Sequence, residues 1–133
     1  MSGVLLDTDV LSFLFKNHPL AARYDSELTD RHLLVSFMTI AELDRWAIHA
    51  NWGEARLQRL HEFLEPFVVA PYNRELCRRW AEVTVAAERR GRRIDCADAW
   101  IAATALLYGV PLVTHNRPHY AGVPGLALIS HAA

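Results

Sequence analysis

The feature that most constrains the fold of this chain is an alternation of short apolar runs with longer stretches of helical periodicity. The apolar runs occupy residues 3–6, 33–36, 67–70, 112–114 and 126–129. The stretches between them repeat apolar residues every three or four positions, at residues 8–14, 19–28, 39–50, 53–64, 73–90 and 94–108. Strands that are apolar throughout are typical of a parallel sheet covered by helices on both faces. The pattern therefore predicts an α/β fold with a central, mostly parallel sheet.

Local signals predict where several of these elements begin and end. Thr39 is expected to be the N-cap of the helix at 39–50, with Glu42 three residues later in the capping-box position. Gly91 is expected to end the helix at 73–90, and Gly109 the helix at 94–108. The last apolar run, at 126–129, is expected at the edge of the sheet.

Length and composition indicate one folded domain. The chain has 133 residues, and we expect residues 1–133 to form a single domain. Hydrophobic residues make up 52% and charged residues 22%, which excludes disorder as the main state. No apolar stretch reaches the roughly 20 residues of a membrane span. Because Asp7 and Asp9 interrupt the first apolar run, it does not resemble a secretory leader. We therefore expect a cytoplasmic protein with no membrane partner.

Acidic and polar side chains follow the predicted strands. Asp7 ends the first strand, Glu42 lies early in the helix after the second, and Asn116 comes just past the fourth. Asp98 lies in the first turn of the helix at 94–108, and Asp95 lies one turn earlier on nearly the same face. In an open α/β sheet, functional groups gather beyond the carboxyl ends of the strands. We therefore expect these side chains to meet at one edge.

A convergence of carboxylates favours a bound cation. A single acid at a helix start needs no functional explanation, because helix N-termini attract negative charge. Several carboxylates together repel one another and lose solvation, and a cation relieves both costs. Oxygen ligands suit Mg²⁺ or Mn²⁺, whereas the two cysteines exclude a four-cysteine zinc site. Such a metal can polarise a phosphodiester and activate a water, which is nuclease chemistry.

Four segments together resemble the PIN domain of VapC-type toxins. They are DTDVL at residues 7–11, TIAEL at 39–43, DAWIAATAL at 98–106 and LVTHN at 112–116. Their order and spacing match across essentially the whole chain. The resemblance implies a three-layer α/β/α sandwich. It also implies a metal-dependent endoribonuclease that is the toxin of a toxin–antitoxin pair.

The resemblance also implies roles for individual residues. Asp7, Glu42 and Asp98 would be the core catalytic acids and bind the metal. Asn116, a fourth candidate metal ligand, falls where many members of the family carry a fourth acid and others an asparagine. An amide offers an oxygen but no charge, so the number of metal ions, one or two, stays open. Four supporting residues would orient the acids or the waters: Thr8, Asp9, Asp95 and Thr114. The implied partners are an RNA such as tRNA or rRNA, a cognate VapB-type antitoxin and a second copy of the chain.

An arginine-rich segment precedes Asp95 and Asp98. Residues 74–93 contain seven arginines and three glutamates, within a chain whose formal net charge is −1. One interpretation is a solvated helix end whose cations suit the helix dipole. The other is a phosphate clamp for RNA, because the guanidinium group binds phosphate at two points. The candidate RNA-binding residues are Arg89, Arg90, Arg92 and Arg93.

Two other residue types invite functional interpretations. The four tryptophans are Trp46, Trp52, Trp80 and Trp100. They could stack on RNA bases, although we expect most of them in the core or in an interface. His115, beside Asn116, could be a general base, but a surface or hydrogen-bonded histidine is the more common case at such a position.

Two alternatives to a nuclease remain. Acids after a first strand also resemble phosphatases of the haloacid dehalogenase type and receiver domains, but both normally need a lysine near the late strands. The only lysine is Lys16, in the first helix. The second alternative is a PIN-like binding scaffold without catalysis, which would be expected to lack one of the three core acids.

Overall fold

The computed structural model describes residues 2–132 and contains a five-stranded sheet. The strands are β1 (Gly3–Leu6), β2 (His32–Ser36), β3 (Val68–Ala70), β4 (Leu112–Val113) and β5 (Leu128–Ile129). Their order across the sheet is β3-β2-β1-β4-β5, and every neighbouring pair is parallel. The predicted parallel sheet is confirmed, and the last strand lies at its edge.

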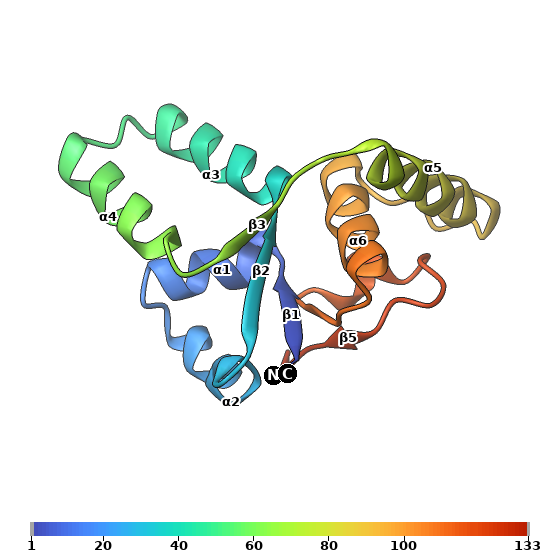
Figure 1. Ribbon diagram of the computed structural model, residues 1–133, viewed down its shortest axis with the longest axis horizontal. Helices are drawn as coiled ribbons and strands as arrows, with labels where there is room; N and C mark the ends of the chain where they lie inside the picture. Colours follow the sequence, from blue (N-terminus) through green and yellow to red (C-terminus); the bar gives the residue numbers. More distant parts are fainter. Residues whose placement is uncertain (1, 133) are drawn as a thin grey trace.

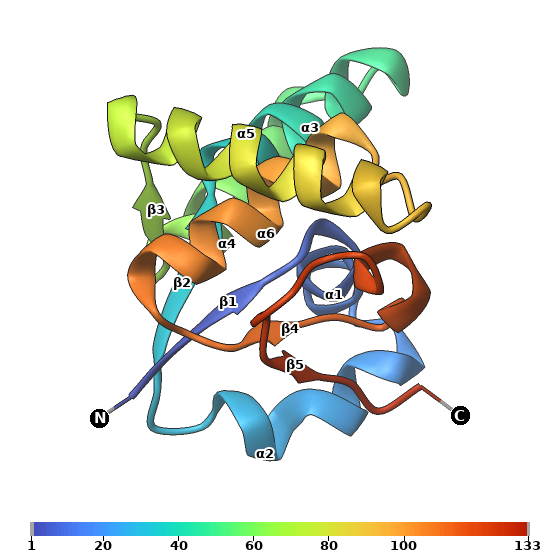
Figure 2. The same cartoon turned by 90° about the vertical axis from the view of Figure 1, so that its right-hand side faces the viewer.

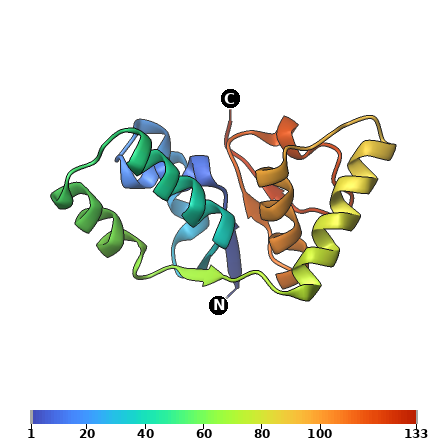
Figure 3. The same cartoon turned by 90° about the horizontal axis from the view of Figure 1, so that it is seen from above.

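Helices cover both faces of this sheet (Figure 1). They are α1 (Thr8–Phe15), α2 (Asp25–Leu28), α3 (Phe37–His49), α4 (Glu54–Leu64), α5 (Arg74–Arg89) and α6 (Cys96–Tyr108), with 3₁₀ turns at η1 (Pro19–Tyr24) and η2 (Arg117–Tyr120). Helices α1 to α4 lie on one side of the strands, and α5 and α6 lie on the other, as the view from above shows (Figure 3). The three-layer α/β/α architecture is confirmed.

The central strand β1 contributes side chains to both hydrophobic cores. Val4 and Leu6 point to the core that contains buried residues of α1, α3 and α4. Leu5 points to the opposite core, which is built mainly by α5 and α6. All three side chains are fully buried. Successive side chains of a strand face opposite sides, so an apolar strand between two helical layers is stabilised on both faces.

Two predicted elements differ from the structure. Thr39 is not an N-cap: α3 begins at Phe37 directly after β2, and Ser36 is its N-cap, with a side chain that accepts a hydrogen bond from Met38 N at 3.0 Å. The stretch at 19–28 is not one helix but η1 followed by the four-residue α2. Both differences occur where the chain joins elements without a loop, so periodicity alone did not mark the boundary.

The remaining boundaries shift by one or two residues. Helix α6 begins at Cys96 with Asp95 as its N-cap residue, and β4 and β5 each have two residues. Gly109 adopts a left-handed conformation (φ 65°) and ends α6 as expected. Within residues 2–132, no helix combines the length and apolarity that crossing a membrane requires.

Candidate active site

The acidic residues predicted from the sequence line one cavity at the carboxyl edge of the central strands. Its volume is about 230 Å³. It is lined by Asp7, Thr8, Asp9, Glu42, Asp95, Ala97, Asp98, Ile101, His119 and Tyr120. These residues come from the end of β1 and from α1, α3, α6 and η2, together with the segment leading into α6. In the side view, η2 and the start of α1 both lie beyond the carboxyl ends of the strands that precede them, β4 and β1 (Figure 2).

Asp7 is the most deeply buried of these acids. Its carboxylate caps α1, since Oδ1 accepts a hydrogen bond from Val10 N at 2.9 Å. Oδ2 accepts a hydrogen bond from Thr114 Oγ1 at 2.5 Å. Burial raises the pKa of Asp7, the two hydrogen bonds lower it, and the charges of Asp9 and Asp98 raise it; together these effects bring it to about 7. Asp7 is therefore a fixed carboxylate with little access to solvent.

Glu42 reaches the cavity from the second turn of α3. It is half-buried, and its Oε1 accepts a hydrogen bond from Thr8 Oγ1 at 2.6 Å. Thr8 Oγ1 also lies 3.0 Å from the hydroxyl oxygen of Thr39. Burial raises the pKa of Glu42, as do the charges of Asp98 and Asp9, while the Thr8 hydrogen bond lowers it. The carboxylate therefore supports a contact between α1 and α3 and does not form the predicted capping box.

Asp98 lies in the first turn of α6 and is held by two residues of η2. The hydroxyl of Tyr120 donates to Oδ1 at 3.3 Å, and Nδ1 of His119 lies 3.2 Å from Oδ2. Burial raises the pKa of Asp98, His119 and the Tyr120 hydrogen bond lower it, and Asp95 and Asp9 raise it. The pKa of Tyr120 is itself raised by burial and by the nearby Asp7 and Asp98. Tyr120 therefore remains a neutral donor.

The chemistry of these groups fits a divalent cation with oxygen ligands. Five carboxylates line one cavity, and three of them, Asp7, Glu42 and Asp98, have a raised pKa caused first by burial and then in part by neighbouring acids. A cation relieves both effects. Each acid is held by its own hydrogen-bond partners, and among residues 2–132 no three His, Cys, Asp or Glu side chains lie close enough together to hold a metal ion as placed here. The donor set fits Mg²⁺ or Mn²⁺ by ligand type.

The supporting residues fall into two groups. Thr8 and Thr114 donate to the acids, as described above, whereas Asp9 and Asp95 line the cavity with exposed side chains. Asn116 does not line it: its side-chain nitrogen lies 3.0 Å from Nε2 of His119. In this structure Asn116 therefore reaches Asp98 through the His119 ring and not by direct contact.

Sequence reasoning gave His119 and Tyr120 no role in the site. Both lie in η2, a short turn whose direction depends on the packing of Tyr120, which is 3% exposed. The available signal was that they follow Asn116 at helical spacing, three and four residues later. His115, by contrast, does not line the cavity, and its Nδ1 lies 2.5 Å from the hydroxyl of Tyr24.

The four predicted RNA-binding arginines are exposed and lie outside the acidic cavity. Arg89 ends α5, and the turn that follows carries Arg90, Arg92 and Arg93 into Ile94 and then Asp95. The turn is held against the segment after η2, because a Cβ on Gly122 would lie 2.5 Å from the carbonyl oxygen of Arg92. The turn therefore has a defined place beside the elements that carry Asp98 and His119.

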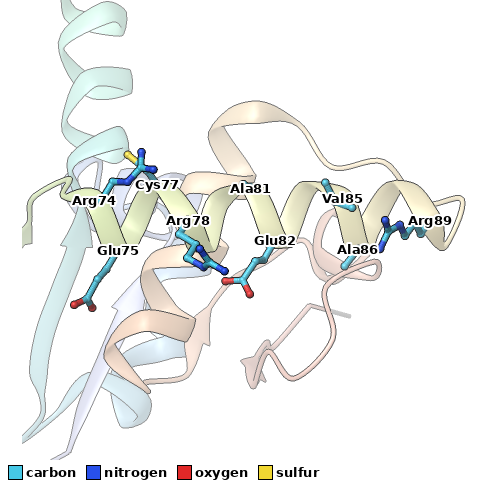
Figure 4. A pocket seen from close by; sticks show the side chains of 9 residues that line it. All are labelled: Arg74, Glu75, Cys77, Arg78, Ala81, Glu82, Val85, Ala86 and Arg89. Atoms are coloured by element: carbon cyan, nitrogen blue, oxygen red, sulfur yellow. The ribbon is translucent and has the colours of Figure 1, made fainter.

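A larger hollow, of about 790 Å³, runs along the outer surface of α5 (Figure 4). All of its lining residues belong to α5, and none of the acids of the candidate site is among them. Arginine and glutamate side chains alternate along it, including Arg78 and Glu82 (Figure 4). The candidate site is therefore not the larger of the two hollows. The smaller cavity is the one that gathers groups with altered pKa values.

The tryptophans and the lysine pack against neighbours on the helical layers. Trp80 and Trp100 stack with ring centroids 5.2 Å apart, and Trp46 meets Trp52 edge-on at 5.0 Å. The ammonium group of Lys16 lies 4.0 Å from the centre of the Trp46 ring and does not line the acidic cavity. A lysine of the kind that phosphotransfer domains require is therefore absent from the lining of this cavity.

Comparisons with known proteins agree with this architecture. The model of the PIN domain family matches residues 4–121. Ribonuclease VapC1 of Haemophilus influenzae (strain R2866) is 30% identical over 124 residues, which are 92% of this chain and 92% of that protein. The tRNA(fMet)-specific endonuclease VapC of Shigella flexneri is 27% identical over 126 residues, 95% of this chain and 96% of its own.

Solved structures show the same fold. VapBC-1 from nontypeable Haemophilus influenzae has a TM-score of 0.82 and 29% identity, and the match covers 98% of both chains. VapBC2 from Rickettsia felis, bound to a DNA fragment from its promoter, has a TM-score of 0.84 and 21% identity, again over 98% of both chains. With its fold, its acidic cavity and these relatives in agreement, the chain belongs to the PIN-domain family and, within it, to the VapC-type proteins.

Proposed function

We propose that the protein is a metal-dependent endoribonuclease and the toxin of a toxin–antitoxin pair. The observation that carries the proposal is the convergence of Asp7, Glu42 and Asp98, from three different elements, on one cavity of a PIN domain. The relatives named as ribonucleases support the reaction type. Its place of action would be the cytoplasm, where its RNA substrates lie.

The three acids would hold Mg²⁺ or Mn²⁺ in the cavity. When bound, such an ion polarises the scissile phosphate and lowers the pKa of a water molecule, so that hydrolysis of the phosphodiester becomes feasible at neutral pH. The other residues fix the acids in place: Thr114 and the Val10 amide hold Asp7, and Thr8 holds Glu42. His119 and Tyr120 hold Asp98, and Asn116 acts through His119.

The substrate class we propose is RNA with a single-stranded or structured target, such as a tRNA or an rRNA. The exposed turn with Arg90, Arg92 and Arg93, together with Arg89 at the end of α5, would hold the phosphate backbone electrostatically. Because the net charge of the chain is −1, this local excess of arginine is the feature that favours binding of a polyanion.

The proposed protein partners are a cognate VapB-type antitoxin and a second copy of the chain. The solved VapBC structures that share this fold support the first partner. Co-purification with the product of the adjacent open reading frame tests for the antitoxin, and light scattering of the purified chain tests for the homodimer. A chain that bound no such product and scattered as a monomer would contradict both assignments.

The nuclease proposal is tested by RNA cleavage with a matched pair of α3 variants. Glu42→Gln removes one carboxylate from the cavity, whereas Asp44→Asn makes the same kind of change at an exposed position two residues later. We expect Glu42→Gln to lower the cleavage rate by about 100-fold or more, the size typical for loss of one group that stabilises a transition state. Asp44→Asn is expected to cut labelled total RNA at the parental rate.

The scaffold alternative makes the opposite prediction for this experiment. A PIN-like scaffold would bind RNA or a partner protein while parent, Glu42→Gln and Asp44→Asn all leave the RNA intact. Equal cleavage by Glu42→Gln and the parent would also exclude the cavity as the reactive site.

A further inference from the structure

One buried hydroxyl connects three segments of the chain near the candidate site. Tyr24, the last residue of η1, is fully buried. Its hydroxyl lies 2.5 Å from Nδ1 of His115 and 3.4 Å from the carbonyl oxygen of Thr114. The same hydroxyl accepts a hydrogen bond from the backbone N–H of His131 at 3.2 Å. It therefore bridges the segments that leave β4 and β5.

These two strands are the shortest in the sheet. Strands β4 and β5 each have two residues, and β5 is an edge strand with one neighbour. Beyond the ladder, the N–H of Thr114 still donates to the carbonyl of Ile129 at 3.0 Å. After these residues, the segment that follows β4 and the segment that follows β5 both leave the sheet. A short edge pairing opens readily, so the Tyr24 hydroxyl holds both segments at the point where the ladder ends.

Thr114 is also the residue that holds Asp7. Its side chain is fully buried and donates to Oδ2 of Asp7, and its Oγ1 accepts a hydrogen bond from the N–H of Asn116 at 3.0 Å. A displacement of the Thr114 backbone would therefore move the side-chain hydroxyl that donates to Asp7. One residue, Thr114, separates Tyr24 from an acid of the cavity.

The C-terminal segment is fastened to η1 and α2 by additional contacts. Nε2 of His131 lies 3.1 Å from Oε1 of Glu27, and the carbonyl of His131 accepts a hydrogen bond from Arg23 Nη1 at 3.2 Å. The rings of Tyr24 and His131 have centroids 5.3 Å apart. The N–H of His131 is thereby presented to the buried hydroxyl and not to solvent.

We propose that Tyr24 is a positioning residue for the candidate active site, because its hydroxyl fixes the exits of β4 and β5 and thereby keeps Thr114 on Asp7. The consequence for metal binding and cleavage rests on the proposed function. The consequence for the Thr114 and Asp7 hydrogen bonds does not.

Tyr24→Phe tests the proposal by removing the hydroxyl and keeping the ring. Tyr72→Phe is the matched control, since Tyr72 is 70% exposed and the deletion is the same. Leu60→Val, a core change in α4, controls for loss of stability alone. All measurements are made well below the thermal midpoint of each variant.

The first readout is amide hydrogen exchange in metal-free protein. The Asn116 N–H reports on Thr114, and the Val10 N–H reports on the Asp7 carboxylate. We expect both to exchange several-fold faster in Tyr24→Phe and at the parental rate in Tyr72→Phe and Leu60→Val. Unchanged exchange of these two amides in Tyr24→Phe would overturn the proposal.

The second readout is binding of Mn²⁺ alone, followed by electron paramagnetic resonance, together with RNA cleavage. Loss of a residue that orients a metal ligand typically weakens metal affinity by about 10-fold or more, and we expect Tyr24→Phe to lower Mn²⁺ affinity and kcat by about 10-fold, with KM for RNA unchanged. Parental Mn²⁺ affinity and kcat in Tyr24→Phe would overturn the proposal. A parent that neither bound Mn²⁺ nor cut RNA would instead refute the proposed function, and hydrogen exchange would still decide the role of Tyr24.

A double variant establishes the route through Thr114. Thr114→Val removes the hydroxyl that donates to Asp7. If Tyr24 acts through Thr114, Tyr24→Phe combined with Thr114→Val binds Mn²⁺ no more weakly than Thr114→Val alone. Independent, additive losses would show that Tyr24 acts by another route and would contradict the proposal.

Discussion

At the scale of single residues, the candidate site consists of acids whose burial works against their charge. Asp7 is 4% exposed and caps a helix, so its carboxylate is fixed before any ligand binds. Its hydrogen bonds from Thr114 and the Val10 amide only partly offset the cost of burial, since the pKa remains raised. The protein therefore retains a destabilising charge at the place where a cation would be useful.

This burial predicts an unusual dependence of stability on pH. The pKa of Asp7 is about 7 in the folded protein, against an ordinary 3.8. Between these values the folded state binds a proton that the unfolded state lacks, so the free energy of unfolding falls as pH rises from about 4 to about 7. In the Asp7→Asn variant residue 7 cannot titrate. From pH 4 to pH 7, the free energy of unfolding of the parent should therefore fall by up to about 4 kcal/mol more than that of the variant.

Urea unfolding at pH 4, 6 and 8, with chelator present, measures this difference. The raised pKa values of Glu42 and Asp98 act in the same direction and remain in the variant, so the comparison isolates Asp7. Parallel stability curves for the parent and Asp7→Asn would show that Asp7 is not held in a protonated state by folding.

The sequence predicted the acids of the site better than it predicted the groups that hold them. Asp7, Glu42 and Asp98 could be chosen as candidates because Asp7 follows a strand and the other two lie in the first two turns of helices at the carboxyl edge of the sheet. His119 and Tyr24 could not, because their roles depend on the short 3₁₀ turns η2 and η1. Tertiary contacts decide the direction of such short turns, and local periodicity does not show which side chains they bring to the site.

At the scale of secondary-structure elements, one close contact fixes the arginine-rich turn. Gly122 lies in the segment after η2, where a Cβ would be 2.5 Å from the Arg92 carbonyl oxygen and 2.9 Å from the Arg92 Cβ. The oxygen belongs to the main chain and the Cβ is bonded directly to it, so neither atom can rotate away from position 122. The turn between α5 and α6 therefore depends on a glycine at position 122.

We expect Gly122→Ala to destabilise the protein by about 1–3 kcal/mol, because the backbone of one of the two segments must shift. Gly53→Ala is the matched control, since nothing lies within 4 Å of a Cβ at Gly53 and its φ of −74° suits any residue. Chemical denaturation measures both. Equal stability of the two variants would mean that the turn is free to move away from Gly122.

The boundaries of the elements show what local signals can and cannot decide. Ser36 and Thr39 are both good N-cap residues, and the capping-box spacing to Glu42 favoured Thr39 in the sequence. The structure uses Ser36, because β2 passes directly into α3 and Thr39 is buried facing Thr8. The requirement to pack α1 against α3 therefore overrode the capping pattern.

At the scale of the whole molecule, the alternation of strands and helices was sufficient to predict the layers but not the strand order. Strand β1 pairs with β2 and β4, with Leu6 opposite Val35 on one side and Val113 on the other. The residues that follow these partners are Asp7, Ser36 and Thr114, so this register brings Asp7 and Thr114 together at the edge of the sheet. Such long-range pairing leaves no trace in local periodicity.

For the molecule as a whole, we propose that the acidic cavity cuts RNA with the help of a divalent metal. The measurement that tests it most directly is cleavage of labelled total RNA by the parent and by Asp98→Asn, with Mg²⁺, with Mn²⁺, with chelator, and with metal restored after chelation. We expect cleavage by the parent with either metal, none with chelator, recovery when metal is restored, and none by Asp98→Asn in any condition. Cleavage that persisted in chelator, or in Asp98→Asn at the parental rate, would contradict metal-dependent cleavage by this cavity.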